Sequence, residues 1–305
     1  MPDRLPPPRQ LGPRLWRLGT RHQPSFLVRG AGQAAIFEVG VTMSAAATLA
    51  QLDALGVARE EVGPVIIAHA HADHSFGAVT LLAGLPRAEL RITAGGQAAL
   101  ARPSLAARFR GEDGYTSAVI AQREGLDLNP PRPAVGPRRL AWRALEAGDS
   151  LDVGGVAMRF LASDGHVPDG LMAWLPEDGA LLASDSAGFL DNGRPGFPLC
   201  FVSWDQYMTT LEVAAALEPA VLGLGHQEEI SGPAVEEYLA ATAQHLEAER
   251  RWLRERLAAC PDPDQVARDY FGRWYHHDLT IFSAEGIWAC CRLLARRSLE
   301  TGAEC

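Results

Sequence analysis

Hydrophobic and polar residues alternate with two different spacings along most of the chain. Short apolar runs rich in β-branched and aromatic residues predict strands, and apolar positions three and four residues apart predict helices. The expected strands cover about residues 14–19, 25–30, 34–39, 65–68, 90–94, 138–145, 156–162, 171–175, 180–184 and 220–223. The expected helices cover about residues 43–56, 76–83, 115–125 and 204–217. This alternation of strands and helices predicts an α/β core.

The character of the sequence changes close to residue 230. Beyond it, residues 234–259 form one long helical pattern with mixed surface charges, and further helical patterns follow near 263–275 and 283–299. We therefore expect two units, a core over residues 1–230 and an all-helical C-terminal cap over residues 231–305. Residues 1–13 are rich in Pro and Arg and predict a loose lead-in, and residues 101–135 give no clear pattern apart from the helix at 115–125.

Composition narrows the functional classes. Hydrophobic residues make up 47% and charged residues 21% of the chain, which argues against disorder. The formal net charge of −9 disfavours binding to a nucleic-acid backbone or to an anionic membrane surface. The sequence shows neither a spanning apolar segment nor a signal peptide, and its five cysteines form no even framework. These features predict a cytoplasmic protein that acts on a small molecule, and they leave a homodimer open.

Candidate chemistry is concentrated in a loop that follows a short apolar run. Val65-Ile66-Ile67-Ala68 predicts a strand buried on both faces, and it leads into the segment His69-Ala-His71-Ala-Asp73-His74. The end of a strand fixes the backbone, so the loop can turn His69 and His71 onto one ion while Asp73 and His74 face a second. Neutral imidazole and carboxylate groups suit Zn²⁺, Fe²⁺ or Mn²⁺.

Three more metal-binding side chains stand where predicted strands end. His166 lies in a turn-rich segment after the strand at 156–162, Asp185 follows the strand at 180–184, and His226 follows the strand at 220–223. Each residue alone has an ordinary structural explanation, as a turn residue, a helix cap or a loop histidine. Together with the histidine-rich loop, they predict one metal centre at an edge of the fold.

The order of these residues resembles the metallo-β-lactamase superfamily, whose pattern is His-x-His-x-Asp-His, a His in a Gly-rich turn, an Asp and a last His. The resemblance covers roughly residues 14–230 and implies an αββα sandwich with two divalent transition-metal ions, Zn, Fe or Mn, at one edge. By position, the first metal would be held by His69, His71 and His166, and the second by Asp73, His74 and His226. Asp185 would bridge both ions, and Asp73 would also act in catalysis by orienting a hydroxide or handling its proton.

Departures from individual branches of the superfamily favour some activities over others. Oxidoreductases with a di-iron centre carry Glu where this chain has His71, which favours hydrolysis here. The glyoxalase II pattern departs at Ala68, which replaces Thr, and at Ser184, which replaces the Gly before the bridging Asp. The resemblance therefore implies the metal centre more firmly than specificity for a glutathione thioester.

A closer resemblance is to the PqsE-like family of quinolone-signal response proteins. The segments Pro24–Arg29 and Phe197–Phe201, the step from His166 to Asp185 and the helical tail look similar in order and spacing. That family is associated with thioester hydrolysis and has C-terminal helices over the metal site. Where it carries a Glu after the bridging Asp, this chain has Phe189, which implies a more apolar pocket. The residues expected to bind substrate are Phe189, Phe282, Ile287 and Trp288.

The sequence thus predicts a dinuclear metal-dependent hydrolase of a small ester-like substrate, with an acyl-CoA-type thioester as the preferred class. A phosphodiesterase or lactonase using the same metals is the alternative within hydrolases. A regulatory or binding protein with a capped, largely idle metal site is an alternative of another kind. An iron-dependent persulfide dioxygenase is the fourth.

Overall fold

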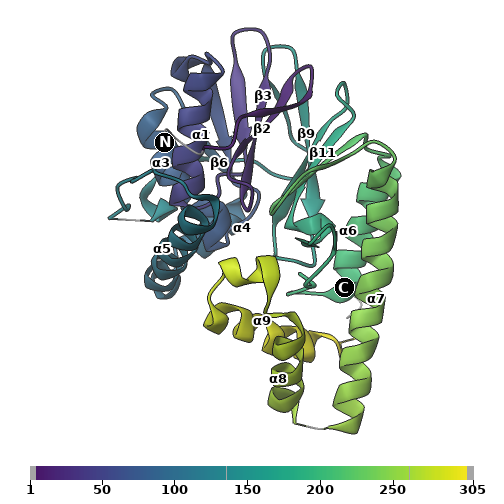
Figure 1. The fold of residues 1–305 in the computed structure, drawn as a ribbon. Coiled ribbons are helices and arrows are strands. Elements are labelled where there is room, and N and C mark those ends of the chain that lie inside the picture. Colours follow the sequence, from purple (N-terminus) through teal and green to yellow (C-terminus); the bar gives the residue numbers. More distant parts are fainter. Residues whose placement is uncertain (1–4, 135, 261, 301–305) are drawn as a thin grey trace.

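Two β-sheets pack face to face, with helices on both outer sides (Figure 1). This computed structural model describes residues 5–134, 136–260 and 262–300. The αββα sandwich expected from the sequence is confirmed, and helices α7 to α9 extend it at the C-terminal end.

The first sheet is mixed. Its strands, in spatial order, are β1 (Arg9–Gly12), β2 (Leu15–Gly19), β3 (Pro24–Arg29), β4 (Ala34–Phe37), β5 (Val62–Ile66), β6 (Glu89–Ile92) and β7 (Trp142–Ala144). Neighbours from β1 to β4 run antiparallel, and neighbours from β4 to β7 run parallel. Parallel neighbours need crossover connections, which here contain α1 (Thr42–Ala54), α2 (Ala72–Ser75), α3 (Gly77–Gly84), α4 (Ala94–Leu100) and α5 (Pro103–Glu124).

The second sheet follows the chain from β8 onward. Its spatial order is β15 (Ile230–Ser231), β14 (Val221–Leu224), β11 (Ala180–Ser184), β10 (Gly170–Leu175), β9 (Ala157–Ser163) and β8 (Ser150–Asp152). Helix α6 (Trp204–Ala216) connects β11 to its parallel neighbour β14. A small separate hairpin, β12 (Leu190–Asp191) with β13 (Arg194–Pro195), lies between β11 and α6 in the chain.

Strand β4 is apolar at every position because both of its faces are covered. In β4, Ala34 and Ile36 belong to the core beneath the outer helices, whereas Ala35 and Phe37 belong to the core between the sheets. Successive side chains of a strand point to opposite faces, so both faces of β4 carry apolar side chains. This confirms that the unbroken apolar runs of the sequence mark strands at the centre of the sandwich.

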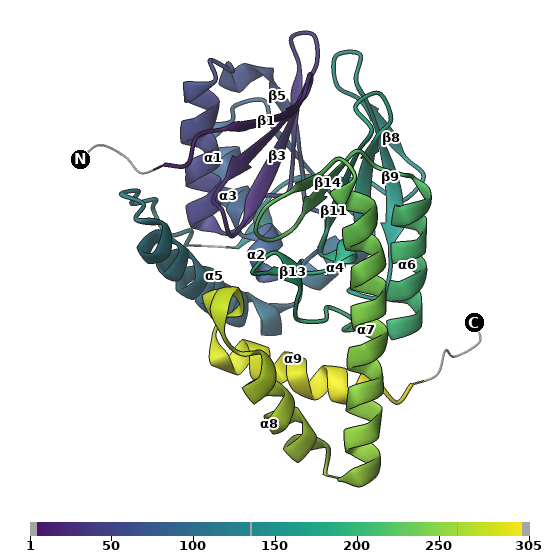
Figure 2. The ribbon, with the colours of Figure 1, turned by 45° about the vertical axis from the view of Figure 1, so that its right-hand side comes forward.

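The C-terminal helices form the cap, which we define as α7 (Ala234–Ala259), α8 (Pro263–Trp274), the short 3-10 helix η4 (His277–Ile281) and α9 (Ala284–Arg297). Figure 2 shows α8 and α9 beneath the sandwich, with α9 between α5 and the long helix α7. Buried residues of the cap share one hydrophobic cluster with the outer side of the second sheet, and residue 230 itself pairs in β15. No helix in the described ranges is both long and apolar enough to cross a membrane.

Several predictions of secondary structure were incomplete. Within the lead-in expected at 1–13, Arg9–Gly12 forms the edge strand β1. The helix expected at 115–125 is the second half of α5, which begins at Pro103 and is capped by Gly125, whose φ is +64°. Gly111 and Gly114 lie inside this helix, and glycine disfavours helix interiors, so local pattern alone placed the start of the helix too late in the chain.

Candidate metal centre

The predicted ligands meet at one edge of the sandwich because the strands that precede them point the same way. Strands β9 and β11 both pair antiparallel with β10, so they share a direction, and β14 runs parallel with β11. His166, Asp185 and His226 follow these three strands. A hydrogen bond from the amide of Leu171 to the carbonyl oxygen of Ala68 joins the second sheet to the loop after β5. The strand ends of both sheets therefore bring their side chains to one place.

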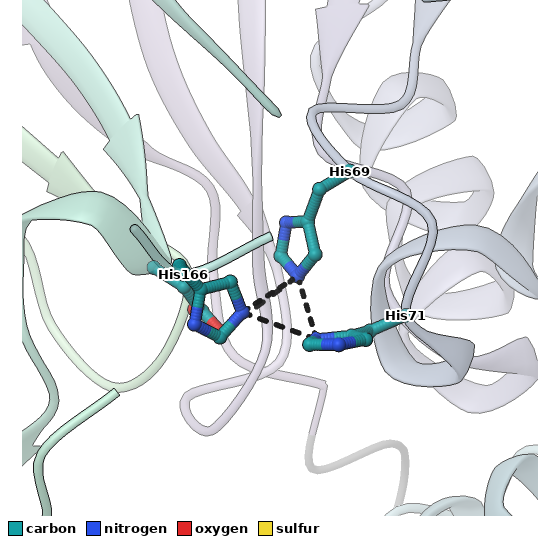
Figure 3. Close-up of side chains that lie close together, drawn as sticks. His69, His71 and His166 are labelled. Carbon is teal, nitrogen blue, oxygen red and sulfur yellow. Dashed lines mark hydrogen bonds and ion pairs between the residues drawn. The ribbon is translucent and has the colours of Figure 1, made fainter. Parts of the chain in front are cut away.

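The first group of donors is His69, His71, His166 and Asp185. Figure 3 shows the three imidazoles turned toward one point, His69 and His71 from the loop after β5 and His166 from the opposite sheet. His69 Nε2 lies 3.1 Å from His71 Nδ1, and His166 Nε2 lies 3.3 Å and 3.1 Å from these two atoms. Asp185 Oδ2 is 3.3 Å from His166 Nε2 and 3.9 Å from His69 Nε2.

The second group is Asp73, His74 and His226, with Asp185 again at its side. His74 Nε2 lies 3.2 Å from His226 Nε2 and 3.4 Å from Asp73 Oδ2. Asp185 reaches this group with both oxygens, since Oδ2 is 3.4 Å from His74 Nε2 and Oδ1 is 3.2 Å from His226 Nε2. Asp185 thus stands between the two groups, as expected of a carboxylate shared by two ions.

The spacing of the donor atoms fits transition-metal ions. Metal–nitrogen distances of about 2.0–2.1 Å in a tetrahedral site place neighbouring donors about 3.3 Å apart. The distances within each group cluster around that value. In addition, Asp185 Oδ1 is buried and makes no hydrogen bond to any described residue. The residues present therefore fit a dinuclear His/Asp metal site.

For two of the rings, His166 and His74, a hydrogen bond on the far side sets the tautomer. His166 Nδ1 lies 2.8 Å from the carbonyl oxygen of Leu199, and a carbonyl can only accept, so this nitrogen carries the proton. His74 Nδ1 lies 2.8 Å from Glu38 Oε2. In the neutral form of both rings the Nε2 lone pair then points at the centre, which is how outer partners orient metal-binding histidines.

Burial and charge place most of these groups in the protonation state that a metal needs. Burial and the neighbouring His166 lower the pKa of His71 to about 3, so His71 is neutral at pH 7. Burial would raise the pKa of Asp73, but the charge of His74 and its hydrogen bond lower it to about 2. His74 is the exception. Although burial opposes its charge, Asp185 and Glu38 raise its pKa well above the usual value. The negative charges of Asp185 and Glu38 thus favour a positive charge at His74, either a proton on the ring or a bound metal ion.

Glu38 is a residue that the sequence analysis missed, and it should strengthen binding of the second metal. We expect Glu38→Gln to weaken that binding about 10- to 100-fold, because the loss of a charged partner loosens His74. A competition titration with a metal chelator measures the change. The matched control is Glu249→Gln, since Glu249 is similarly buried but pairs with Arg273 in the cap. Equal affinities in wild type and Glu38→Gln would contradict this role.

A cavity of about 270 Å³ opens beside the metal centre, between α5 and the cap. Its wall includes His71, Asp73, His166, Asp185 and His226. Most other wall residues are apolar; the main ones are Phe109, Phe189, Phe197, Leu199, Phe201, Leu279, Phe282, Ile287, Ala289, Cys290 and Leu293. The one cationic side chain among the described wall residues is Arg108, which pairs with Glu112 at 2.7 Å. The site therefore joins a charged centre to an apolar chamber.

The four residues expected to bind substrate do not all line this cavity. Phe189, Phe282 and Ile287 do, and the rings of Phe189 and Phe282 lie 5.5 Å and 5.4 Å from that of His226. Trp288 is not among the described wall residues, and its ring packs against Phe271 instead. Trp288 lies about 100° around α9 from Ile287, and this rotation places its ring against Phe271 of α8.

Two histidines outside the metal centre make contacts inside the protein. His22 is buried, its Nδ1 lies 2.7 Å from Glu124 Oε1, and its carbonyl oxygen is 3.4 Å from His226 Nδ1. His245 is half-buried and lies 2.8 Å from the carbonyl oxygen of Gly196. Neither contact could be read locally, because each joins segments far apart in the chain.

Comparison with known proteins agrees with this geometry. The family model described as the metallo-beta-lactamase superfamily matches residues 18–226. A hydroxyacylglutathione hydrolase from Acidiphilium cryptum (strain JF-5) is 28% identical over 212 residues, or 68% of this chain and 65% of that protein. The chain thus spans just under two thirds of the length of this curated relative.

Solved structures share the fold at lower identity. A metallo-beta-lactamase family protein from Thermus thermophilus aligns with a TM-score of 0.60 and 20% identity over 91% of this chain and 93% of that one. A beta-lactamase domain protein from Burkholderia ambifaria aligns with a TM-score of 0.57 and 22% identity over 82% and 78%. With its αββα sandwich, its paired His/Asp groups and the family match across both, the chain belongs to the metallo-β-lactamase superfamily and is distantly homologous to hydroxyacylglutathione hydrolase, glyoxalase II.

Proposed function

We propose that this metallohydrolase cleaves a thioester whose acyl part is apolar, as in an acyl-CoA. The observation that carries the proposal is the apolar chamber that opens directly onto the paired His/Asp groups. A small-molecule site of this kind combines a few placed polar groups with mostly hydrophobic walls. The distant relative named as a hydroxyacylglutathione hydrolase supports the thioester class.

Metal ions bound here would lower the pKa of a bound water molecule, and their positive charge would polarise the substrate oxygen. The side chains around the centre would position the water and limit its access. Asp73 lies on the cavity wall and accepts a hydrogen bond from Gln23 Nε2 at 3.4 Å, so its carboxylate is held where it can orient the attacking water. Phe201, whose ring is 5.1 Å from that of His166, shields the first group from bulk water. A thiolate is a good leaving group, so it can leave without a general acid.

A phosphodiester would suit the chamber less well. Its negative charge would meet Arg108, which is already paired with Glu112, and otherwise mostly apolar side chains. The first experiment therefore compares kcat/KM for acyl-CoAs of increasing length, bis(p-nitrophenyl) phosphate and a homoserine lactone. Highest activity on an acyl-CoA supports the proposal. Highest activity on the phosphodiester or the lactone rejects the thioester. If none of these substrates is turned over, the result favours a binding protein or a persulfide dioxygenase.

The chamber should also set the preferred acyl length. In Ile287→Trp the larger side chain fills the cavity, so we expect kcat/KM for long acyl chains to fall about 10-fold relative to acetyl-CoA. The control is Trp288→Phe on the next position of α9, which packs against Phe271 and should leave the length profile unchanged. A profile that shifts equally in both variants would place the acyl chain elsewhere.

A further inference from the structure

A second cluster of metal-binding side chains lies outside the dinuclear centre, where the cap meets the β12–β13 hairpin. Asp191 ends β12, His276 immediately precedes η4, and His277 is its first residue. One donor atom from each residue lies within 4.8 Å of the others. His276 Nδ1 and His277 Nδ1 are 3.0 Å apart, and His277 Nδ1 is 3.5 Å from Asp191 Oδ2. These distances resemble those within the dinuclear centre.

The hydrogen bonds of His276 leave its inner nitrogen free to bind a metal. Its Nε2 lies 2.8 Å from the carbonyl oxygen of Arg273, and a carbonyl can only accept. In the neutral ring Nε2 therefore carries the proton, and Nδ1 presents a lone pair toward His277. The ring also stacks on Trp274, with centroids 6.4 Å apart and planes at 27°. Its position is thus fixed from two sides.

The carboxylate of Asp191 is oriented in the same way. Its Oδ1 accepts a hydrogen bond from the backbone N–H of Asp278 at 3.4 Å, which leaves Oδ2 on the side of His277. The carboxylate of this cluster thus comes from the β12–β13 hairpin, and both imidazoles come from the segment between α8 and α9.

The backbone of His277 is strained in a way that brings the two imidazoles together. Its φ is +46°, in the left-handed region that residues other than glycine seldom adopt. Side chains of consecutive residues usually diverge, yet the rings of His276 and His277 have centroids only 4.4 Å apart. Such strain persists where the surrounding structure compensates for it, and it concentrates at functional sites.

We infer that Asp191, His276 and His277 form a third metal site, which binds Zn²⁺ through two Nδ1 atoms and one carboxylate oxygen. Three protein donors with an open fourth position are a familiar zinc arrangement. The ion would join η4 to the hairpin. Both segments lead into the cavity wall, η4 at Phe282 and the hairpin at Phe189, so this zinc would hold the two sides of the chamber together.

Zinc binding to full-length protein tests the site. Wild type and His277→Asn are equilibrated at a free zinc concentration that saturates the wild type, and bound zinc is measured by elemental analysis. Asparagine tolerates the left-handed backbone, so this change removes the imidazole with little effect on the turn. We expect the variant to bind one equivalent less than wild type. Because the readout is a difference, it is independent of how the dinuclear centre is loaded.

Asp191→Asn should show the same loss, and it serves if His277→Asn does not fold. The matched control is Glu285→Gln, which removes an exposed carboxylate from the cap but not from the site, and it should bind as much zinc as wild type. Hydrogen exchange gives a second readout, since zinc should slow exchange of the Leu279 and Phe282 amides in wild type only. Equal zinc content in wild type and both variants would overturn the inference and leave the two imidazoles sharing only a hydrogen bond.

Discussion

Asp185→Asn should lower kcat/KM by at least about 100-fold and release at least one metal ion, while the protein stays folded. Removal of one preorganised electrostatic group from an active site typically costs this much or more. Asp185 reaches both groups of histidines, with Oδ2 3.3 Å from His166 Nε2 and Oδ1 3.2 Å from His226 Nε2. Asparagine keeps the shape of the side chain but removes the charge that balances two cations.

Activity on the best thioester, metal content and circular dichroism together measure this effect. Asp113→Asn is the matched control, because Asp113 is as buried as Asp185 but accepts hydrogen bonds from Thr42. It should keep its metal and its activity. Wild-type turnover by a folded Asp185→Asn protein would rule out the two-metal mechanism.

Gly225→Ala should have an effect of similar size, although it adds only one methyl group. A Cβ at this position would lie 2.3 Å from Asp185 Oδ1 and 2.9 Å from His74 Cε1. Both neighbours belong to the metal centre and are buried, so neither can move aside without displacing a donor. We expect loss of metal from the second group and a drop in kcat/KM of about 100-fold or more.

The control for this substitution is Gly63→Ala in β5, where an added Cβ meets no heavy atom within 4 Å. Metal content and thermal stability should be close to wild type in the control. In Gly225→Ala the metal content should fall more than the stability does, because the clash is confined to the centre. Full metal occupancy in that variant would show that the loop before His226 adjusts.

The sequence predicted the centre better than its surroundings. All of its candidate metal ligands lie in the segments that follow strands, and strands with unbroken apolar patterns are easy to recognise. Glu38 escaped notice because it contacts His74 across 36 positions of sequence, and nothing local marks it. Gly225 escaped for the same reason, since its role is to leave room for a side chain from another strand.

The residues of the cavity wall were harder to predict from the sequence than the metal ligands. The face of a helix that lines a chamber depends on how the helix is rotated, and aromatic character alone cannot tell Ile287 from Trp288. The contribution of α5 through Phe109 and Arg108 was also missed, because the helix itself was recognised only in its second half. Tertiary packing, not local pattern, determines these positions.

The convergence of strand ends from both sheets has a consequence for how the protein assembles. His74 and His226 are 152 residues apart in the chain, and no single sheet contains a full set of donors for both ions among the described residues. Contacts between such distant segments form late, because closing the intervening chain costs entropy before any contact repays it. A ligand that binds only the native state stabilises it by mass action. Both metal ions would therefore bind only after the two sheets have packed together. Bound metal would then be a measure of how much of the protein has reached the native packing of the two sheets.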